Sequence, residues 1–394
     1  MDYLLIISYF TLLLWLYLLL AHGKYLFFRG RNFWCNEIIF KNIFMTKNKK
    51  EILCKVCVII PARNEQNNIS KTLNSIKDQK LKNIDIIVVD DNSEDKTSYL
   101  VKKFKKTFKN TFLLNGKKLP TGWVGKTWAL KQGVDFANKK KFDYYMFIDS
   151  DIILKNNLLK NTIYFIEKNN LLMVSLMAKL NCCSFWEKLL IPPFIYFFQK
   201  IYPFNLVNTK DSKVSAAAGG FILCKASIFK KENLYNRIKN KLIDDCNIAK
   251  LFKEKGNIWL GLTNEVVSGR KYNNLQSIWK MVSRTAFEQL NYSLALLFLS
   301  LLGLFLIYMF PISLILLVPI LFNVDSIFIH LLMINTCSFL IMTTVFSPTL
   351  KFYKMKKLFA LTLPFSALLY GIMTTSSAIN YLLSEGNVWK GRRY

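Results

Sequence analysis

The distribution of apolar residues along the chain limits its possible folds more than any other feature. Residues 3–21 form one uncharged apolar run, and from residue 292 to about residue 383 the chain is again mostly apolar. A run of the first kind is long enough to cross a bilayer as a helix. Because the residues between these regions carry nearly all of the charge, we expect four parts: an N-terminal transmembrane anchor at 1–22, a water-facing domain at 45–290, C-terminal transmembrane helices at 292–383 and a basic tail at 384–394.

The first apolar run is interpreted as an uncleaved anchor rather than as a signal peptide. Only Met1 and Asp2 precede it, whereas a signal peptide begins with a positively charged segment. Basic residues follow the run instead, beginning at Lys24. Because basic residues collect on the cytoplasmic side of a span, we expect the N-terminus outside and the domain at 45–290 in the cytoplasm.

The C-terminal apolar region contains three candidate spans whose orientation is ambiguous. They are expected at 292–310, 327–346 and 358–383, and Pro311 with 312–322 either extends the first span or forms a short extra segment. The loop before the last span and the tail are both basic, so the positive-inside rule cannot hold at both ends of that span. Upstream, the aromatic stretch 186–207 is interrupted by two prolines, and it is either a helix at the membrane interface or a buried core helix.

The positive charge of the chain suits an anionic partner, although Lys, Asn and Ile are over-used throughout, which fits an AT-rich genome as well as any function. The sequence has 54 Lys and Arg residues against 25 Asp and Glu residues, a formal net charge of +29. A basic domain beside a membrane attracts anionic lipid headgroups, and it would equally attract a nucleotide diphosphate. No recognised nucleic-acid-binding motif accompanies the charge. We therefore expect a membrane and a phosphorylated ligand as partners, and no nucleic acid.

Buried strands alternate with helices in the first part of the water-facing domain. Strands are predicted at 56–61, 84–89, 111–114 and 144–148, with helical segments between them. This alternation predicts an α/β fold with a mainly parallel sheet. Ligands bind such sheets beyond the carboxyl ends of the strands. Because Glu65, Asp90 and Asp149 each follow a predicted strand, we expect them to converge at one edge of the sheet.

Three close pairs of aspartates are the strongest chemical signal in the chain. They are Asp90-Asp91, Asp149-Ser150-Asp151 and Asp244-Asp245. Neighbouring carboxylates repel each other, so such pairs usually have a cation, a proton or a base as partner. On extended backbone the side chains of Asp149 and Asp151 leave on the same side, and ligation by oxygen alone suits Mg²⁺ or Mn²⁺. Taken alone, however, an Asp-x-Asp sequence is more often a turn with capping aspartates.

The remaining polar residues each have a functional and a structural interpretation. Asp90 and Asp91 either bind a nucleobase or ribose or cap the helix that follows them. Lys126 follows two glycines near a helix start, where it either holds phosphate oxygens or is simply solvated. Asp244 and Asp245 begin a predicted helix, so one of them either takes a proton from an acceptor hydroxyl or caps the helix.

Gly219 and Gly220 precede a predicted strand within the segment 215–224. Glycines at such a position allow the backbone to turn sharply or to approach another group closely. Further along, the segment 277–288 has an amphipathic pattern that suits a helix lying on the bilayer, and it contains Arg284.

These motifs resemble those of the family 2 glycosyltransferases, which have the GT-A fold. The matching elements are Pro61–Glu65, Val89–Ser93, Asp149–Asp151 and Asp244–Asp245. More narrowly, the chain is similar to the hopene-associated glycosyltransferases of hopanoid-producing bacteria. This similarity runs nearly from end to end and rests on the longer motifs Leu119–Leu130, Trp186–Pro192, Phe198–Phe204, Ala216–Gly220, Leu242–Cys246 and Ile258–Thr263.

The resemblance implies a role for each polar residue. Asp149 and Asp151 would bind the divalent ion that bridges the sugar diphosphate. Asp245, beside Asp244, would be the catalytic base of a single displacement that inverts the anomeric carbon. The residues that would contact the substrate are Glu65, Asp90, Asp91, Lys126, Gly219, Gly220 and Arg284.

One departure from the family pattern bears on the product. Processive members carry a Gln-x-x-Arg-Trp element after the acidic pair, whereas Arg284 stands in Ser-Arg-Thr-Ala with no Trp after it. We therefore expect transfer of a single sugar rather than synthesis of a polysaccharide. Arg284 then either meets a phosphate or lies at the membrane surface.

The sequence thus predicts a multi-pass protein of the bacterial inner membrane whose GT-A glycosyltransferase domain faces the cytoplasm. It would transfer a sugar from a nucleotide-diphosphate sugar to a lipid acceptor, such as a hopanoid, with Mg²⁺ or Mn²⁺. Two alternatives stay open. Transfer to a polyprenyl phosphate would need no base, because that acceptor is already ionised, and a non-enzymatic transporter or scaffold would bind no nucleotide.

Overall fold

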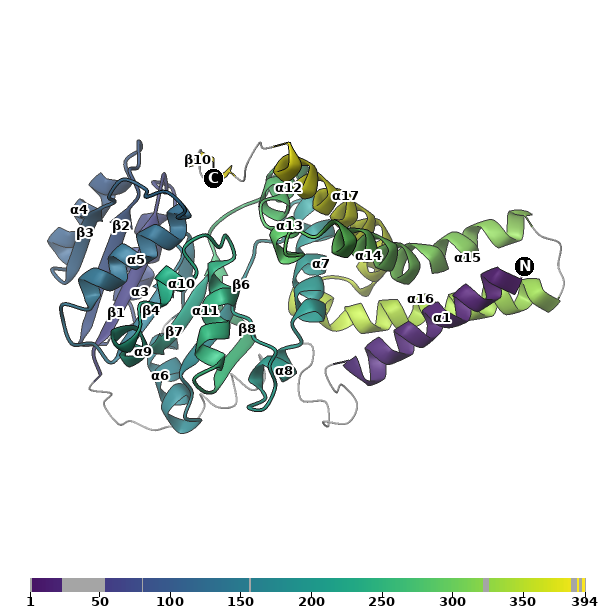
Figure 1. The fold of residues 1–394 in the computed structure, drawn as a ribbon, viewed down its shortest axis with the longest axis horizontal. Helices are drawn as coiled ribbons and strands as arrows, with labels where there is room; N and C mark the ends of the chain where they lie inside the picture. Colours follow the sequence, from purple (N-terminus) through teal and green to yellow (C-terminus); the bar gives the residue numbers. More distant parts are fainter. Residues whose placement is uncertain are drawn as a thin grey trace. The chain divides into compact units, whose positions relative to one another are not determined.

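The structure is a computed structural model of the 394-residue chain. It describes residues 2–22, 54–79, 81–155, 157–321, 326–383, 388–389 and 392–393. The basic segment after the first span and most of the basic tail lie outside these residues. The described residues divide into two units (Figure 1). The helical unit takes its residues from Met1–Cys35, Cys182–Asn205 and Tyr272–Asn387, and the α/β unit takes its residues from Asn36–Asn181, Leu206–Lys271 and Val388–Tyr394.

The α/β unit is built on an 8-stranded sheet in the order β3-β2-β1-β4-β7-β6-β8-β5. Neighbours among β3, β2, β1 and β4 run parallel, as do β6 and β8. β7 is antiparallel to β4 and to β6, and β5 is antiparallel to β8. The predicted α/β fold with a mainly parallel sheet is therefore confirmed. The strands are β1 Val56–Ala62, β2 Ile84–Asp90, β3 Thr111–Asn115, β4 Tyr144–Ile148, β5 Ile152–Leu154, β6 Met173–Lys179, β7 Phe221–Lys225 and β8 Ile258–Ser268, with β9 Val388–Trp389 paired separately to β10 Arg392–Arg393.

Helices cover both faces of the sheet because its central strands are apolar on both sides. All residues of β1 are buried. Val58 and Ile60 pack in one cluster with side chains of α3, α4 and α6. On the other face a Cβ at Gly133 of α5 would lie 2.5 Å from Ile59 Cγ2, so this glycine lets the helix approach the strand closely. The helices of this part are α3 Ile69–Lys77, α4 Thr97–Thr107, α5 Gly125–Ala137, α6 Leu158–Lys168, α9 Ser227–Lys231, α10 Leu234–Arg237 and α11 Asp244–Lys253, and the short helix α8 Phe204–Asn208 begins in the helical unit and ends in the α/β unit.

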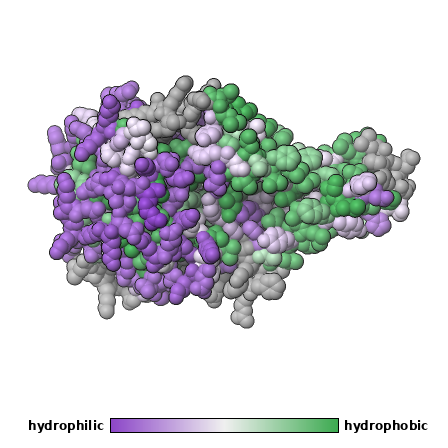
Figure 2. All heavy atoms as spheres, viewed as in Figure 1, coloured by the Kyte–Doolittle hydropathy of each residue, from purple (hydrophilic) through white to green (hydrophobic). Residues whose placement is uncertain are grey.

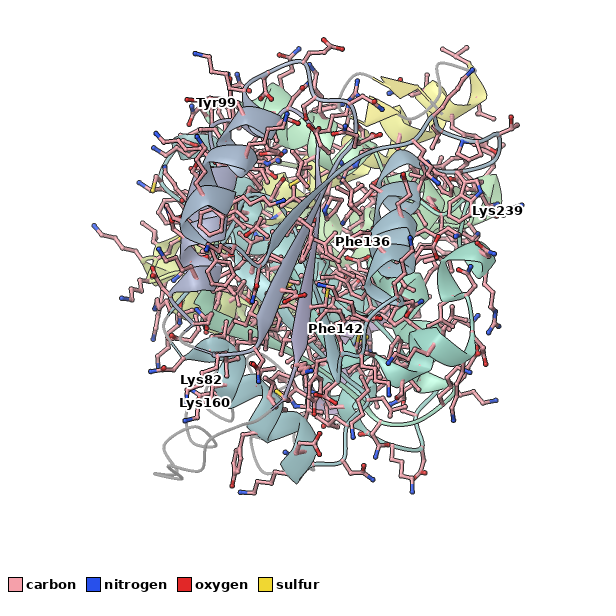
Figure 3. All side chains as sticks on the ribbon, turned by 90° about the vertical axis from the view of Figure 1, so that its left-hand side faces the viewer. Lys82, Tyr99, Phe136, Phe142, Lys160 and Lys239 are labelled. Atoms are coloured by element: carbon pink, nitrogen blue, oxygen red, sulfur yellow. The ribbon has the colours of Figure 1, made fainter. Side chains whose placement is uncertain are left out.

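Part of the positive charge of the α/β unit lies at its periphery. Figure 3 shows Lys82, Lys160 and Lys239 toward the outside of the unit, and Figure 2 shows polar residues over the face of the unit that it draws. These lysines therefore contribute to the charge of the surface rather than to the core.

Four helices of the helical unit are long and apolar enough to cross a membrane. They are Asp2–Leu20, Leu294–Ile320, Ser326–Phe352 and Lys357–Leu382. Figure 2 shows apolar residues over these helices. Residues 312–321 extend the first C-terminal candidate span, because the helix continues through Pro311 to Leu321, whereas residue 322 lies outside the described residues. The elements of the unit are α1 Asp2–Leu20, α7 Phe185–Ile201, α12 Leu275–Ser283, α13 Ala286–Gln289, α14 Leu294–Leu304, η2 Phe305–Met309, α15 Phe310–Leu321, α16 Ser326–Phe352, η3 Lys357–Thr362 and α17 Leu363–Leu382.

The aromatic stretch at 186–207 is mainly the helix α7, which begins at a capping box. Ser184 Oγ accepts a hydrogen bond from Glu187 N, and the Glu187 side chain accepts hydrogen bonds from the backbone at the helix start. Leu189 and Leu190 are buried and pack in one cluster with side chains of α12 and α17. This packing favours the interpretation of the stretch as a buried helix.

Pro311 is accommodated by a π-helical turn and by hydrogen bonds from the first helix. Proline has no N–H, so it leaves a carbonyl of the preceding turn without its helical partner. Trp15 Nε1 of α1 donates to Ile307 O at 2.9 Å, and Thr11 Oγ1 lies 3.4 Å from Leu306 O. These are the two carbonyls that an N–H at position 311 would meet in an α-helix or in a π-helix. The first helix therefore supplies the donors that Pro311 lacks.

We expect Trp15→Phe to destabilise the folded chain by about 0.6–2 kcal/mol, because it leaves the carbonyl of Ile307 without a donor. In a Pro311→Ala background, whose backbone N–H can serve that carbonyl, the same change is expected to cost much less. Denaturant unfolding of the four proteins of this cycle in detergent measures the difference. An equal cost of Trp15→Phe in both backgrounds would show that the indole acts only through packing.

Candidate active site

The carboxyl edge of the parallel strands gathers the polar residues that the sequence singled out. β1 is followed by Glu65, β2 ends at Asp90 and β4 ends just before Asp149. Lys126 comes from the first turn of α5, and Asp244 begins α11. Three strands and two helix starts therefore deliver side chains to this edge, as the alternation of strands and helices predicts.

Lys126 joins two of the acidic pairs. Its Nζ lies 3.1 Å from Asp149 Oδ1 and 3.3 Å from Asp244 Oδ1. Burial disfavours the charged ammonium group, but the carboxylates of Asp149, Asp244 and Asp245 outweigh that penalty and raise the pKa of Lys126. The residue is therefore a fixed positive charge between the pairs, and these contacts exclude its interpretation as a simply solvated lysine.

Asp245 is held by two backbone N–H groups. Gly219 N donates to its Oδ2 at 2.7 Å, and Cys246 N donates to its Oδ1 at 2.8 Å. Burial and then repulsion by Asp244 raise the pKa of Asp245 to about 6, although Lys126 acts in the opposite direction. A carboxylate with such a pKa is ionised at neutral pH and can still accept a proton, which suits a general base.

The two glycines before β7 serve different purposes. A Cβ at Gly219 would lie 3.1 Å from Lys126 Nζ and 3.2 Å from Asp245 Oδ2, so a side chain at this position would crowd the cluster. A Cβ at Gly220 would instead lie 3.0 Å from Ala178 Cβ, among apolar side chains. The predicted close approach is therefore found at Gly219, whereas a substrate contact by Gly220 stays a prediction.

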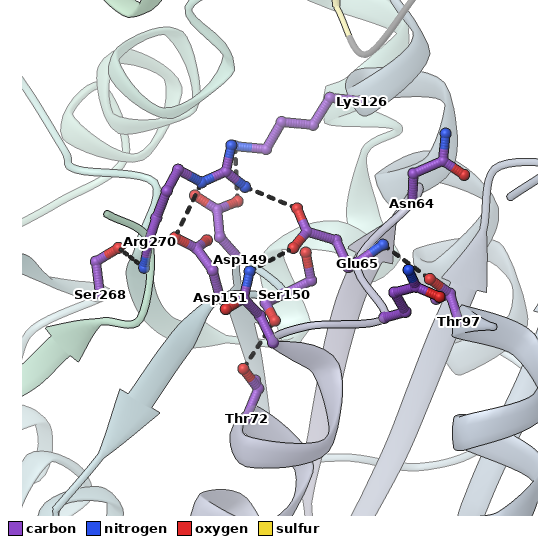
Figure 4. A network of polar contacts seen from close by, with 12 residues as sticks. Asn64, Glu65, Thr72, Thr97, Lys126, Asp149, Ser150, Asp151, Ser268 and Arg270 are labelled. Atoms are coloured by element: carbon purple, nitrogen blue, oxygen red, sulfur yellow. Dashed lines mark hydrogen bonds and ion pairs between the residues drawn. The ribbon is translucent and has the colours of Figure 1, made fainter. Parts of the chain in front are cut away.

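A second cluster surrounds Asp151 (Figure 4). Ser268 Oγ donates to Asp151 Oδ2 at 2.8 Å, and Arg270 Nε lies 3.4 Å from the same oxygen. Arg270 Nη2 also donates to Glu65 Oε1 at 2.7 Å. Burial raises the pKa of Asp151, although the charge of Arg270 opposes the shift. Glu65, Arg270 and Asp151 thus form a chain of alternating charges next to the Lys126 cluster.

The backbone around Ser150 is a turn, so the expected geometry of the Asp-x-Asp element is wrong. Asp149 follows the end of β4, and Ile152 N donates to Asp149 O at 3.2 Å, which closes a turn over these residues. The prediction that both carboxylates leave on the same side assumed an extended backbone. Instead Asp149 meets Lys126, whereas Asp151 meets Ser268 and Arg270.

The two aspartates nevertheless fit a divalent cation that prefers oxygen. Within the described residues, the bonded contacts of Asp149 involve Oδ1 and those of Asp151 involve Oδ2, which leaves one oxygen open on each. No group of three His, Cys, Asp or Glu side chains in the described part of the chain is placed to hold a metal ion by itself. Mg²⁺ typically needs only one or two carboxylates in addition to substrate phosphates and water.

The pair at the end of β2 is engaged in local structure. Asp90 Oδ1 accepts hydrogen bonds from Ser93 N and Ser93 Oγ, and Asp90 Oδ2 accepts one from Ser98 Oγ. Arg63 Nη1 donates to the backbone oxygen of Asp91 at 2.6 Å. These contacts hold the turn after β2. Asp90 does not cap α4, whose N-cap is Lys96 with no side-chain hydrogen bond, and nucleotide binding by the pair stays a prediction.

Two arginines differ in how the sequence prediction relates to the site in the structure. Arg284 follows α12 in the helical unit and is exposed, so a contact with phosphate stays a prediction. Arg270, in contrast, belongs to the site and was not predicted. An arginine directly after a glycine at the end of a strand could have indicated Arg270 as a site residue. β8 was not recognised as a strand from the sequence, so this pattern was missed.

The central part of the chain matches a known family. Residues 57–232 match the model described as Glycosyl transferase family 2. This segment is a family 2 glycosyltransferase domain. The matched segment of the glycosyltransferase domain includes Glu65, Lys126 and Asp149, whereas Asp245 and Arg270 follow it in the sequence.

The glycosyltransferase domain also resembles parts of curated proteins. Over 114 residues the chain is 32% identical to a 4,4'-diaponeurosporenoate glycosyltransferase of Staphylococcus haemolyticus. This match covers 29% of this chain and 28% of that protein. Over 95 residues it is 41% identical to an uncharacterized protein of Methanocaldococcus jannaschii, which covers 24% of this chain and 38% of that protein. The chain therefore matches well under half of the length of these relatives.

A solved structure shares the fold of the glycosyltransferase domain. The mannosyltransferase PcManGT from Pyrobaculum calidifontis, in complex with GDP-Man and Mn²⁺, matches with a TM-score of 0.52 and 12% sequence identity. The match covers 95% of this chain and 99% of that one. At this identity the likeness concerns the fold alone, and it agrees with the GT-A fold expected from the sequence.

Proposed function

We propose that the protein is a membrane-anchored, inverting glycosyltransferase that moves a sugar from a nucleotide-diphosphate sugar to a lipid acceptor. The observation that carries the proposal is the cluster in which Lys126 bridges Asp149 and Asp244, with Asp245 beside it, at the carboxyl edge of a family 2 domain. Such a site offers a positive group for a diphosphate and a carboxylate for a proton.

Asp245 is proposed as the base. The N–H groups of Gly219 and Cys246 fix its carboxylate, and its raised pKa suits removal of a proton from a hydroxyl group. The acceptor oxygen, once deprotonated, attacks the anomeric carbon from the face opposite the departing diphosphate, which inverts the configuration. Lys126 would donate to the diphosphate oxygens and so stabilise the negative charge that develops on the leaving group.

Asp149 and Asp151 are proposed to hold Mg²⁺ or Mn²⁺ through their open oxygens. When bound, such an ion neutralises charge on a leaving diphosphate. The proposal is supported by the carboxylate oxygens of the two aspartates and by the solved structure of the same fold that contains Mn²⁺ with GDP-Man. Glu65, Asp90, Asp91, Gly220 and Arg284 are proposed as further substrate contacts on the family resemblance alone.

A lipid acceptor is proposed because four helices are long and apolar enough to cross a membrane. A hydrophobic acceptor has to be met at the bilayer surface, where a membrane-anchored domain can reach it. The name of one relative, a diaponeurosporenoate glycosyltransferase, supports a lipid-like acceptor. A hopanoid acceptor, the bacterial inner membrane and a cytoplasmic catalytic side are proposed on the sequence resemblance and on the positive-inside rule.

Sugar transfer by membranes that contain the protein tests this function. A panel of labelled nucleotide sugars would be supplied with Mn²⁺, with Mg²⁺ or with a chelator, and label would be followed into extracted lipid. We expect one donor to give labelled lipid only when the divalent ion is present. If no donor labels lipid and no nucleotide binds to the purified protein, the transferase proposal fails in favour of a scaffold.

The raised pKa of Asp245 predicts an acid limit of activity. The base works in its ionised form, so kcat/KM for transfer is expected to fall about tenfold per pH unit below roughly pH 6. An ordinary aspartate would hold its charge down to about pH 4. Values of kcat/KM measured between about pH 4 and pH 6 distinguish a base with a raised pKa from an ordinary aspartate. A kcat/KM that stays level down to about pH 4 would argue against Asp245 as the base.

A further inference from the structure

The contacts of Asp151 are divided between its two carboxylate oxygens. Asp151 Oδ2 accepts a hydrogen bond from Ser268 Oγ at 2.8 Å and lies 3.4 Å from Arg270 Nε. Among the residues that the structure describes, no hydrogen bond or ion pair reaches Asp151 Oδ1. One oxygen is therefore held in place and the other is open.

The segment Ser268-Gly269-Arg270 also fixes the backbone of Asp151. Gly269 N donates to Asp151 O at 2.6 Å, and Arg270 N donates to Ser268 Oγ at 3.2 Å. The antiparallel pairing of β5 with β8 places Ile152 opposite Ser268. A Cβ at Gly269 would lie 3.1 Å from Asp151 O, so a glycine permits this close approach. The segment thus holds Asp151 at its main chain and at one carboxylate oxygen.

Glu65 holds Arg270 from the opposite side. Its Oε1 accepts from Arg270 Nη2 at 2.7 Å, and its Oε2 accepts from Asn68 Nδ2 at 3.0 Å. Glu65 is only 3% exposed, whereas the Arg270 side chain is 38% exposed. A guanidinium group is planar with donors in a fixed fork, so contacts to both Glu65 and Asp151 fix its orientation.

We propose that Arg270 is a positioning residue for the cation site: held by Glu65, it fixes Asp151 Oδ2 and thereby presents Asp151 Oδ1, beside Asp149, to a divalent cation. The inference rests on the proposed function, because it deepens the role given there to Asp149 and Asp151. Groups that hydrogen-bond a metal ligand without touching the metal orient that ligand. On this view Glu65 also acts on the cation site, through Arg270.

Charge alone predicts the opposite effect, and this makes the inference testable. A guanidinium group near a cation site repels the cation. If Arg270 acted only through its charge, its removal would tighten binding of a divalent ion wherever Asp151 stays ionised, and Arg270→Lys, which keeps the charge, would bind the ion like the wild type. If Arg270 positions Asp151, its removal weakens binding although a repelling charge is lost.

The test measures binding of Mn²⁺ alone to the full-length protein, from the paramagnetic resonance signal of free Mn²⁺, and then repeats it with a nucleoside diphosphate present. Arg270→Gln is expected to weaken binding about 10–100-fold. Arg270→Lys is expected to bind Mn²⁺ almost as weakly as Arg270→Gln, because one ammonium group cannot reproduce the fork of a guanidinium group. Ser268→Ala removes a single hydroxyl and is expected to have a smaller effect of the same sign. Arg237→Gln removes an ion-paired arginine elsewhere in the α/β unit and is expected to leave binding unchanged.

Each outcome decides one point. Unchanged or tighter Mn²⁺ binding in a folded Arg270→Gln protein overturns the inference, and thermal unfolding checks the fold. If Arg270→Gln does not fold, unchanged binding in both Arg270→Lys and Ser268→Ala overturns it instead. A wild-type protein that binds no Mn²⁺ refutes the cation site of the proposed function and this inference with it. If Asp151→Asn loses Mn²⁺ binding whereas a folded Arg270→Gln protein keeps it, only the role of Arg270 is refuted and the cation site stands.

Discussion

Replacing Asp245 with Asn is expected to lower the rate of sugar transfer by about 10²–10⁴-fold, the usual contribution of a general base. The substitution keeps the size of the side chain and one oxygen that can accept from Gly219 N or Cys246 N, so the start of α11 is expected to persist. What is lost is the group that takes the proton of the acceptor hydroxyl. Initial rates of label transfer into lipid, at saturating donor, measure the effect.

The control for this change is Asp135→Asn. Asp135 is an exposed aspartate of α5 that pairs with Lys131, and its loss is expected to leave the rate unchanged. Transfer near the wild-type rate in Asp245→Asn, with folding and nucleotide binding intact, would contradict the assignment of the base. It would favour a polyprenyl phosphate acceptor, which carries its own negative charge and needs no base.

Replacing Lys126 with Met is expected to raise the KM for the nucleotide sugar by roughly 10–100-fold, since a hydrogen bond to a charged group contributes about 1.5–3 kcal/mol. The change also removes the charge that lowers the pKa of Asp245. The acid limit of kcat/KM is therefore expected to move to higher pH. Steady-state rates over a range of donor concentrations and pH values record both effects.

Lys131→Met is the matched control for Lys126. Lys131 lies further along α5 and pairs with Asp135 rather than with the acidic pairs of the site. We expect its KM and pH profile to match those of the wild type. An unchanged KM and an unmoved acid limit in Lys126→Met would show that the lysine serves only the structure of the free protein.

The parallel half of the sheet was predictable because its strands carry an unambiguous pattern. β1, β2 and β4 are apolar runs that are buried almost throughout, and each ends at a polar turn. β8 lacks this pattern. It contains Gly261, Thr263, Asn264 and Glu265, and it is ordered by pairing with β6 and with the short strand β5, contacts that no local pattern reveals.

The site was predicted in its acidic members but not in its connections. Short spacing along the chain identified Asp149 and Asp151, but the direction of their side chains depends on a turn that forms only when Ile152 N meets Asp149 O. Arg270 was missed because its partners lie far away in the sequence: Glu65 is separated from it by 205 residues and Asp151 by 119 residues. A single sequence carries no direct signal for such pairs.

The hydrogen bond from Trp15 to the carbonyl of Ile307 constrains how the protein is made. The two residues are 292 positions apart, and the matched segment of the glycosyltransferase domain is translated between them. At about 5–20 residues per second, a ribosome needs roughly 15–60 s to bridge that interval. During this time the indole donor of the first helix has no carbonyl partner at Ile307, while the glycosyltransferase domain emerges and can fold. The helical unit is therefore completed last, and it is completed around the helix that was translated first.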